Sequence, residues 1–138
     1  MGDIDGALSA LKESADTFLA LAREDASDAR AQRDTAVAFN NLGDLYLQKD
    51  DSEGARASFA ESVAALKPLV AIDEANIPAK TELAGALIKL AGVSDDAEAR
   101  YHEALEILEP LEVAGKLNER QAGWIEMVKA QLTALGGN

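Results

Sequence analysis

The stretch 39–46, FNNLGDLY, is followed at 54–59 by GARASF. In the first segment Phe39, Leu42 and Tyr46 recur at intervals of three and four residues, the spacing that places side chains on one face of an α-helix. Gly43 interrupts this pattern in mid-helix, where a glycine costs about 1 kcal/mol relative to alanine. We therefore expect a packing gain at Gly43 that offsets this cost.

A related pattern recurs along the chain. Six residues of the segment 55–69 are repeated 42 positions later, and an upstream copy begins near Gly6 at an offset of 48. The first two sets are Ala55, Phe59, Glu61, Leu66, Pro68 and Leu69, and Ala97, Tyr101, Glu103, Leu108, Pro110 and Leu111. Self-similarity at such a period is typical of repeat proteins, in which similar units stack on their neighbours.

The two quoted segments resemble a tetratricopeptide repeat, a pair of antiparallel helices. Six residues match the family at consensus spacing: Phe39, Leu42, Gly43, Tyr46, Ala55 and Phe59. The resemblance implies an all-α, tetratricopeptide-like solenoid of helical hairpins with about six antiparallel helices. It also implies close crossings of Gly43 and Gly85 opposite Ala55 and Ala97. The period exceeds that of the family, as in bacterial proteins with loosely spaced, long-period repeats.

Apolar spacing and capping residues predict the helices and their grouping. The expected helices are 5–23, 28–48, 52–71, 78–92, 95–114 and 118–135. Their expected caps are Asp28 or Ser27, Ser52, Asn76, and Ser94 or Asp95. We expect one domain over 1–138, composed of a half repeat 1–27, repeats 28–73 and 76–114, and a C-terminal capping helix 117–138. Trp124, Val128, Leu132 and Leu135 are expected to face inward from that last helix.

Composition excludes several classes of function. The net charge is −12, whereas nucleic-acid binding needs a basic surface. There is no cysteine, and no apolar run approaches the roughly 20 residues of a membrane span. The acidic start of the chain does not resemble a signal peptide. We therefore expect a cytoplasmic protein that contacts neither nucleic acid nor membrane.

No pattern in the chain indicates catalysis. The single histidine, His102, is interpreted as a solvated surface residue. Two segments, 3–6 and 51–54, imitate part of a calcium loop but lack the closing bidentate glutamate. Neither a phosphate-binding glycine loop nor a nucleophile with histidine and acid neighbours is found. We expect no enzyme activity, no catalytic residue, no metal and no cofactor.

The resemblance implies a concave groove lined by the first helix of each pair. Its predicted peptide-binding residues are Val37, Asn40, Asn41, Asp44, Gln48, Glu82 and Lys89. The family's clamp for a terminal carboxylate is not expected, because only Asn41 matches it and Leu83 stands where a basic residue is needed. Asp44 and Glu82 favour a basic or neutral partner, and Asn41 packing or capping inside the hairpin is the alternative to a groove role.

The main functional prediction is a protein–protein interaction scaffold that holds a peptide or helix of a partner in this groove. One alternative is a self-associating repeat fragment, and the other is a regulatory domain of a larger, enzymatic protein. The register places 5–23 as a second helix without its first. Its apolar residues exceed one buried stripe, which favours a homo-oligomer through this helix: Leu8, Leu11, Ala15, Phe18 and Leu19.

Overall fold

A computed structural model describes residues 3–136, and this part of the chain holds six α-helices and no β-strand. The all-α prediction is confirmed for these residues, and every helix begins and ends within two residues of its predicted bounds. The outer limits 1 and 138 of the predicted domain lie outside the described residues. The helices are α1 Asp3–Glu24, α2 Ala29–Gln48, α3 Ser52–Ile72, α4 Ile77–Ala91, α5 Ala97–Val113 and α6 Glu119–Ala134.

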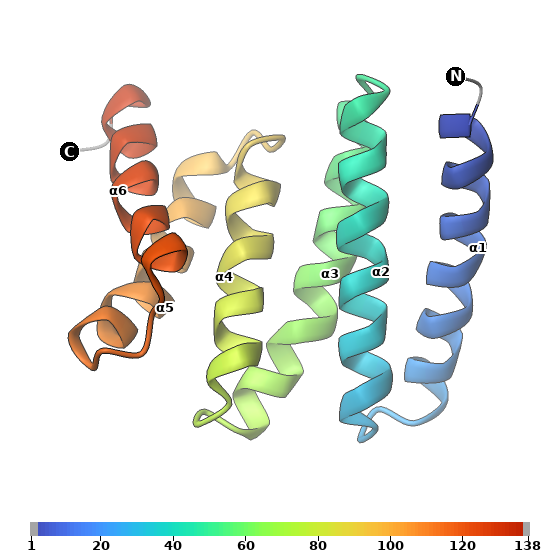
Figure 1. Ribbon diagram of the computed structural model, residues 1–138, viewed down its shortest axis with the longest axis horizontal. Helices are drawn as coiled ribbons and strands as arrows, with labels where there is room; N and C mark the ends of the chain where they lie inside the picture. The colour runs from blue at the N-terminus through green and yellow to red at the C-terminus, as the bar shows by residue number, and fades with distance from the viewer. Residues whose placement is uncertain (1–2, 137–138) are drawn as a thin grey trace.

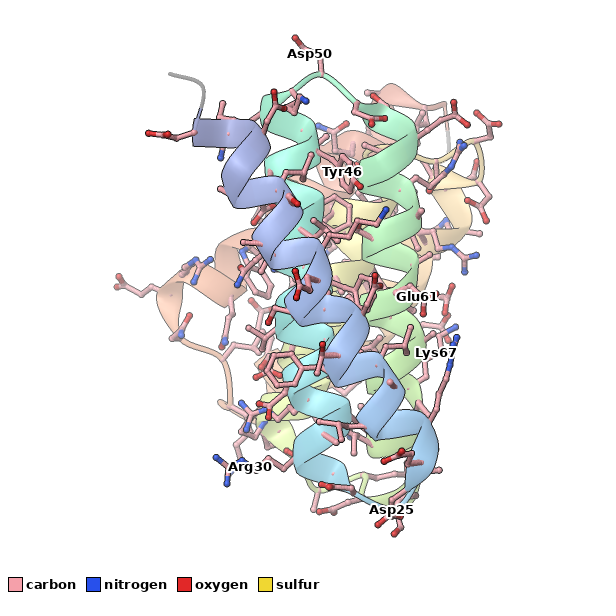
Figure 2. The ribbon with its side chains drawn as sticks, turned by 90° about the vertical axis from the view of Figure 1, so that its right-hand side faces the viewer. Asp25, Arg30, Tyr46, Asp50, Glu61 and Lys67 are labelled. Atoms are coloured by element: carbon pink, nitrogen blue, oxygen red, sulfur yellow. The ribbon has the colours of Figure 1, made fainter. Side chains whose placement is uncertain are left out.

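The helices form two layers. Each helix packs against the next along the chain, and consecutive helices run in opposite directions (Figure 1). In that view α2, α4 and α6 lie in front, and α3 and α5 lie behind them. Figure 2 shows α1 crossing obliquely over the α2–α3 pair at one end of the stack. The chain therefore runs from one end of the stack to the other.

Short polar residues fix where the helices start. The side chains of Asp28, Asp51 and Asn76 accept hydrogen bonds from backbone N–H groups three residues ahead, at 2.9–3.1 Å. Such a cap satisfies an N–H that the first turn leaves without a helical partner. The predictions for Asp28 and Asn76 are confirmed. The prediction of Ser52 is wrong by one residue, because Asp51 occupies the N-cap position before the helix and its side chain accepts a hydrogen bond from the Gly54 N–H.

The last two helices start differently from each other. Asp96 precedes α5 without a side-chain cap, so the expected cap at Ser94 or Asp95 is wrong. Ser94 instead donates to the Leu90 carbonyl at the end of α4, at 2.6 Å. Asn118 and Gln121 form a reciprocal capping box at the start of α6. The start of α6, which carries part of the candidate site, is thus fixed locally.

The central core lies between α2, α3 and α4. Phe59, Leu66 and Leu87 are fully buried there, and Leu42 is buried between α1 and α2. On α6, Val128 and Leu132 are buried as predicted, but Leu135 is 51% exposed. The buried face of α6 runs from Ile125 through these two residues at helical spacing, and Leu135 is the C-cap residue beyond it.

The apolar stripe of α1 is only partly covered. Ala15 is buried, whereas four larger side chains remain half-buried while packing against Phe39 and Leu42 of α2. Those four are Leu8, Leu11, Phe18 and Leu19. α1 therefore places the whole stripe on α2 without enclosing it. Coverage of the remaining surface by a second copy of the chain stays a prediction.

A small charge cluster joins α3 to α5. The Glu103 carboxylate lies 3.3 Å from the Lys67 ammonium and 2.7 Å from the Arg100 guanidinium. Partial burial raises the pKa of Glu103, but hydrogen bonds and attraction from Arg100 and Lys67 outweigh burial and hold this pKa below its ordinary value. Glu103 therefore stabilises the folded state in its charged form.

Replacing this carboxylate gives a pH-dependent effect. We expect Glu103→Gln to reduce the free energy of unfolding at neutral pH by less than about 1 kcal/mol, since the pairs are partly solvated. Because the folded-state pKa is lowered, this contribution is present above the ordinary pKa of 4.5 and is lost as pH falls through the folded value. Urea unfolding across this range tests it, with exposed Glu106→Gln as control. A difference that persists unchanged in acid contradicts the assignment.

Candidate functional site

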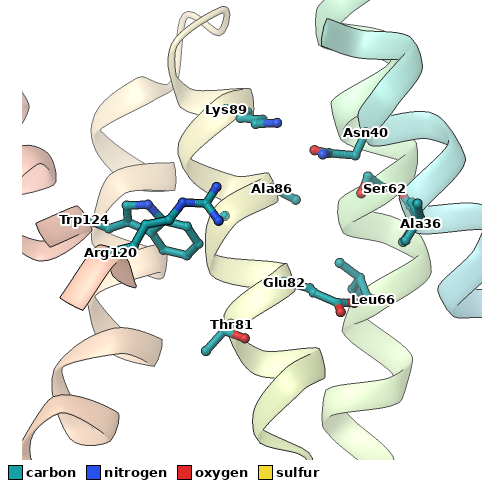
Figure 3. Close-up of a pocket in the computed structure, with 12 residues that line it drawn as sticks. Ala36, Asn40, Ser62, Leu66, Thr81, Glu82, Ala86, Lys89, Arg120 and Trp124 are labelled. Carbon is teal, nitrogen blue, oxygen red and sulfur yellow. Dashed lines mark hydrogen bonds between the residues drawn. The ribbon is translucent and has the colours of Figure 1, made fainter. Parts of the chain in front are cut away.

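A hollow of about 200 Å³ opens on the face formed by α2, α4 and α6 (Figure 3). Val37 and Asn40 of α2 form one wall, and Glu82 and Lys89 of α4 form the other. We call this the α2–α4 hollow. Its floor consists of short or apolar side chains: Ala36, Ser62, Leu66, Thr81, Gly85 and Ala86. The floor is therefore nearly free of charge, with charged groups at the rim.

The third side of the hollow comes from α6. Trp124 and Arg120 line it, and the Arg120 guanidinium carbon lies 5.5 Å from the Trp124 ring centroid. A Cβ added at Gly85 would lie 3.4 Å from the Trp124 ring, an ordinary van der Waals distance, so Gly85 faces the indole and not Ala97. The predicted pairing of Gly85 with Ala97 is wrong for this reason. Trp124 faces inward from α6 as predicted, and its ring lines the α2–α4 hollow.

Four of the predicted groove residues line this hollow, namely Val37, Asn40, Glu82 and Lys89. Asp44 contacts the hollow indirectly, through an ion pair with Lys89. The other two predicted residues, Asn41 and Gln48, are exposed and are not part of the lining. Asn41 follows Asn40 by one residue, which turns its side chain about 100° around the helix axis. Because it is exposed, Asn41 does not pack inside the hairpin either.

Two ion pairs bridge α2 and α4 across the rim. The Lys89 ammonium lies 3.0 Å from one Asp44 carboxylate oxygen and 3.1 Å from the other. Arg33 donates to Glu82 through two nitrogens, one at 3.1 Å, and these hydrogen bonds raise the pKa of the Arg33 guanidinium. Both carboxylates that favoured a basic partner are thus neutralised within the chain. They provide no remaining reason to prefer a basic peptide.

A second hollow continues from the first toward the start of α2. Its lining includes Arg30, Arg33 and Asp34, together with Leu69 of α3 and Asn76 at the start of α4. Val37 lines both hollows, and 51% of its surface is exposed between them. We call this the α2 N-terminal hollow. The two hollows therefore adjoin at Val37 on α2.

Sequence reasoning did not find Arg120, Arg30 or Arg33 as members of this face. The first lies on the last helix, more than 30 residues beyond the α4 residues that line the hollow, and the other two precede the repeat motif. A basic residue near the start of a helix is a weak signal, since most such residues are solvated. Only the packing of α6 against α5 places Arg120 beside α4.

Neither a metal site nor a membrane-spanning helix is found in the part of the chain that the structure describes. Among residues 3–136, no three His, Asp or Glu side chains lie close enough together to hold a metal ion. His102 is exposed, as predicted. None of the described helices combines the length and apolar character needed to cross a membrane.

The described fold and its depression define an all-α protein with a partly apolar, ion-pair-rimmed surface groove. Comparison of the chain with protein-family models, curated proteins and solved structures found no match. The tetratricopeptide resemblance therefore rests on the register of the quoted residues alone.

Proposed function

We propose that the chain is a tetratricopeptide-like interaction module that binds a peptide or helix of a partner protein in the α2–α4 hollow. The observation that carries this proposal is the hollow itself. It has a floor of short or apolar side chains, such as Ala36, Leu66 and Ala86, beneath a charged rim. A concave, mostly apolar site with a few polar groups at its edge is the usual form of a binding site.

The position of the hollow also supports the proposal. It lies along α2 and α4, the helices on which the resemblance places a peptide groove, and four residues expected from that resemblance line it. Asn40 is half-buried there and offers both a donor and an acceptor to a peptide backbone. Val37 leaves 51% of its surface exposed at the rim, where a ligand can cover it.

An unbiased selection tests this function. Random 12-residue peptides displayed on phage are selected against the immobilised chain, and enriched peptides are synthesised and titrated in solution. We expect Val37→Arg to weaken their binding at least about tenfold, because the longer charged side chain obstructs the rim of the hollow. Val113→Arg is the matched control, since Val113 is 90% exposed at the end of α5 and lies outside both hollows.

The outcomes are distinct. Peptides that bind both the wild type and Val113→Arg but not Val37→Arg support the groove. Absence of any enriched peptide, or equal binding to both variants, contradicts a peptide-binding function at this site. Because both valines are exposed, neither change removes core packing, and circular dichroism verifies that the two variants keep their helices.

A further inference from the structure

The side chains that line the two hollows carry a net positive charge, whereas the chain as a whole is negative. The linings of the two hollows contain four cations, Arg30, Arg33, Lys89 and Arg120, and two carboxylates, Asp34 and Glu82. The difference is 4 − 2 = +2, on a chain whose net charge is −12. With Asp44, which pairs with Lys89, the face still has four cations against three carboxylates. Cations thus outnumber carboxylates along these two hollows.

Within the α2–α4 hollow, Arg120 differs from the other charged residues. Glu82 and Lys89 each have an ion partner on the opposite helix. Arg120 has none within 4.0 Å among residues 3–136. In Figure 3 its guanidinium extends from α6 toward α4, in front of the Trp124 ring. The charge that remains uncompensated at this hollow is therefore positive and directed toward it.

The environment of Arg120 suits a carboxylate. A guanidinium over an aromatic face keeps its N–H donors at the edge of the plane, where they match the two oxygens of a carboxylate. The Arg120 guanidinium lies over the Trp124 ring, although the Arg120 residue as a whole is exposed. Arginine placed in this way loses less freedom when it forms hydrogen bonds than a fully mobile side chain does.

The hollow beside Arg120 has room for one large apolar side chain. Its volume is about 200 Å³, and a closed apolar cavity of about 150 Å³ is sufficient for benzene. Leu66 and Ala86 provide apolar contacts at the floor, and Trp124 provides an aromatic wall. An apolar group and a carboxylate are therefore accommodated side by side.

We infer that the hollow binds an acidic, apolar segment of a partner protein, with a large apolar side chain on the Leu66–Ala86 floor and a neighbouring Asp or Glu carboxylate on Arg120. This inference rests on the proposed peptide-binding function and specifies its partner. It reverses the preference for a basic peptide that the carboxylates of Asp44 and Glu82 suggested. Both of those groups are occupied by Lys89 and Arg33.

Three small probes of one shape separate the possible charges of the partner. These are 3-phenylpropionate, 3-phenylpropanamide and 3-phenylpropylamine, which are negative, neutral and positive around the same ring. Trp124 is the only tryptophan of the chain, so its indole N–H gives a single NMR signal at the site. Titration of each probe into the whole chain at low salt, followed through this signal, gives its affinity for the hollow.

We expect the carboxylate probe to bind about fivefold more tightly than the amide, as for one partly solvated charge pair, and the amine to bind most weakly. Arg120→Gln should remove the preference for the carboxylate over the amide. Arg120→Lys, which keeps the charge but not the planar pair of donors, should retain part of it. Added sodium chloride should reduce the preference through screening.

Arg23→Gln is the matched control, because it removes the same charge from an exposed position on α1. The inference is overturned if the amide or amine binds as tightly as the carboxylate, if Arg120→Gln keeps the preference, or if no probe moves the Trp124 signal. These outcomes differ from a failure of the proposed function. Phage-selected peptides that depend on Val37 but lack acidic residues would leave a peptide groove in place and overturn only its acidic partner.

Discussion

Phe59→Ala is expected to lower the free energy of unfolding by about 3–5 kcal/mol, the largest effect of any single change considered. Phe59 is 0% exposed, and its ring lies against Gly43 of α2 and 5.8 Å below the Lys89 ammonium of α4. Truncation removes buried apolar surface and leaves a cavity where three helices meet. Because helices on both sides contact the ring, they cannot close the space without separating other contacts.

Urea unfolding followed by circular dichroism measures this loss. Val113→Ala is the matched control, since that valine is 90% exposed, and its change should be within about 0.5 kcal/mol of zero. A loss below about 0.5 kcal/mol for Phe59→Ala would place Phe59 outside the core and contradict the packing of α2 on α3.

Gly43→Ala is expected to destabilise the protein by up to about 2 kcal/mol, although alanine is the better helix former. A Cβ at Gly43 would meet the Phe59 ring, and a buried ring in a filled core has little room to move. Overpacking of this kind costs about 1–3 kcal/mol, which exceeds the gain of about 1 kcal/mol in helix propensity.

Gly123→Ala is the matched control for this change. Gly123 also lies inside a helix, but a Cβ there would have nothing within 4 Å, so propensity alone should stabilise the protein by up to about 1 kcal/mol. Both changes are measured by urea unfolding. A double change of Gly43→Ala with Phe59→Leu tests the mechanism, because the smaller side chain should relieve the clash and make the two effects non-additive. Stabilisation by Gly43→Ala alone contradicts the close approach.

The helices were predictable because the signals that define them are local. Asp28 and Asn76 cap amides three residues ahead, and apolar spacing within one turn marks the buried face. The cap at α3 was placed on Ser52 instead of Asp51, since two neighbouring short polar residues satisfy the same pattern. Leu135 was expected to be buried because it continues the apolar spacing of α6, but the helix ends before it.

The candidate site was predicted only in part, because local signals do not show how distant helices pack. The register of the repeat identified one wall of the hollow, at Val37 and Asn40, and the other at Glu82 and Lys89. It could not identify Arg120, because the resemblance gives no rule for the direction in which the last helix returns. Asn41 was included because the resemblance places an asparagine of the carboxylate clamp at this position, but its side chain is exposed.

The sequence alone determined that this protein consists of amphipathic helices with repeated apolar faces, and where those helices begin and end. Helix caps, apolar periodicity and the helix-weakening effect of glycine each involve residues only a few positions apart. They can therefore be recognised directly in the sequence. Only the tertiary structure decided which charges are neutralised and which remain free. Asp44 pairs with Lys89 and Glu82 with Arg33 across more than 40 residues, while the packing of α6 brings Arg120 beside α4. Each of these contacts depends on how whole helices pack, and many alternative pairs of the same charges are equally compatible with the sequence.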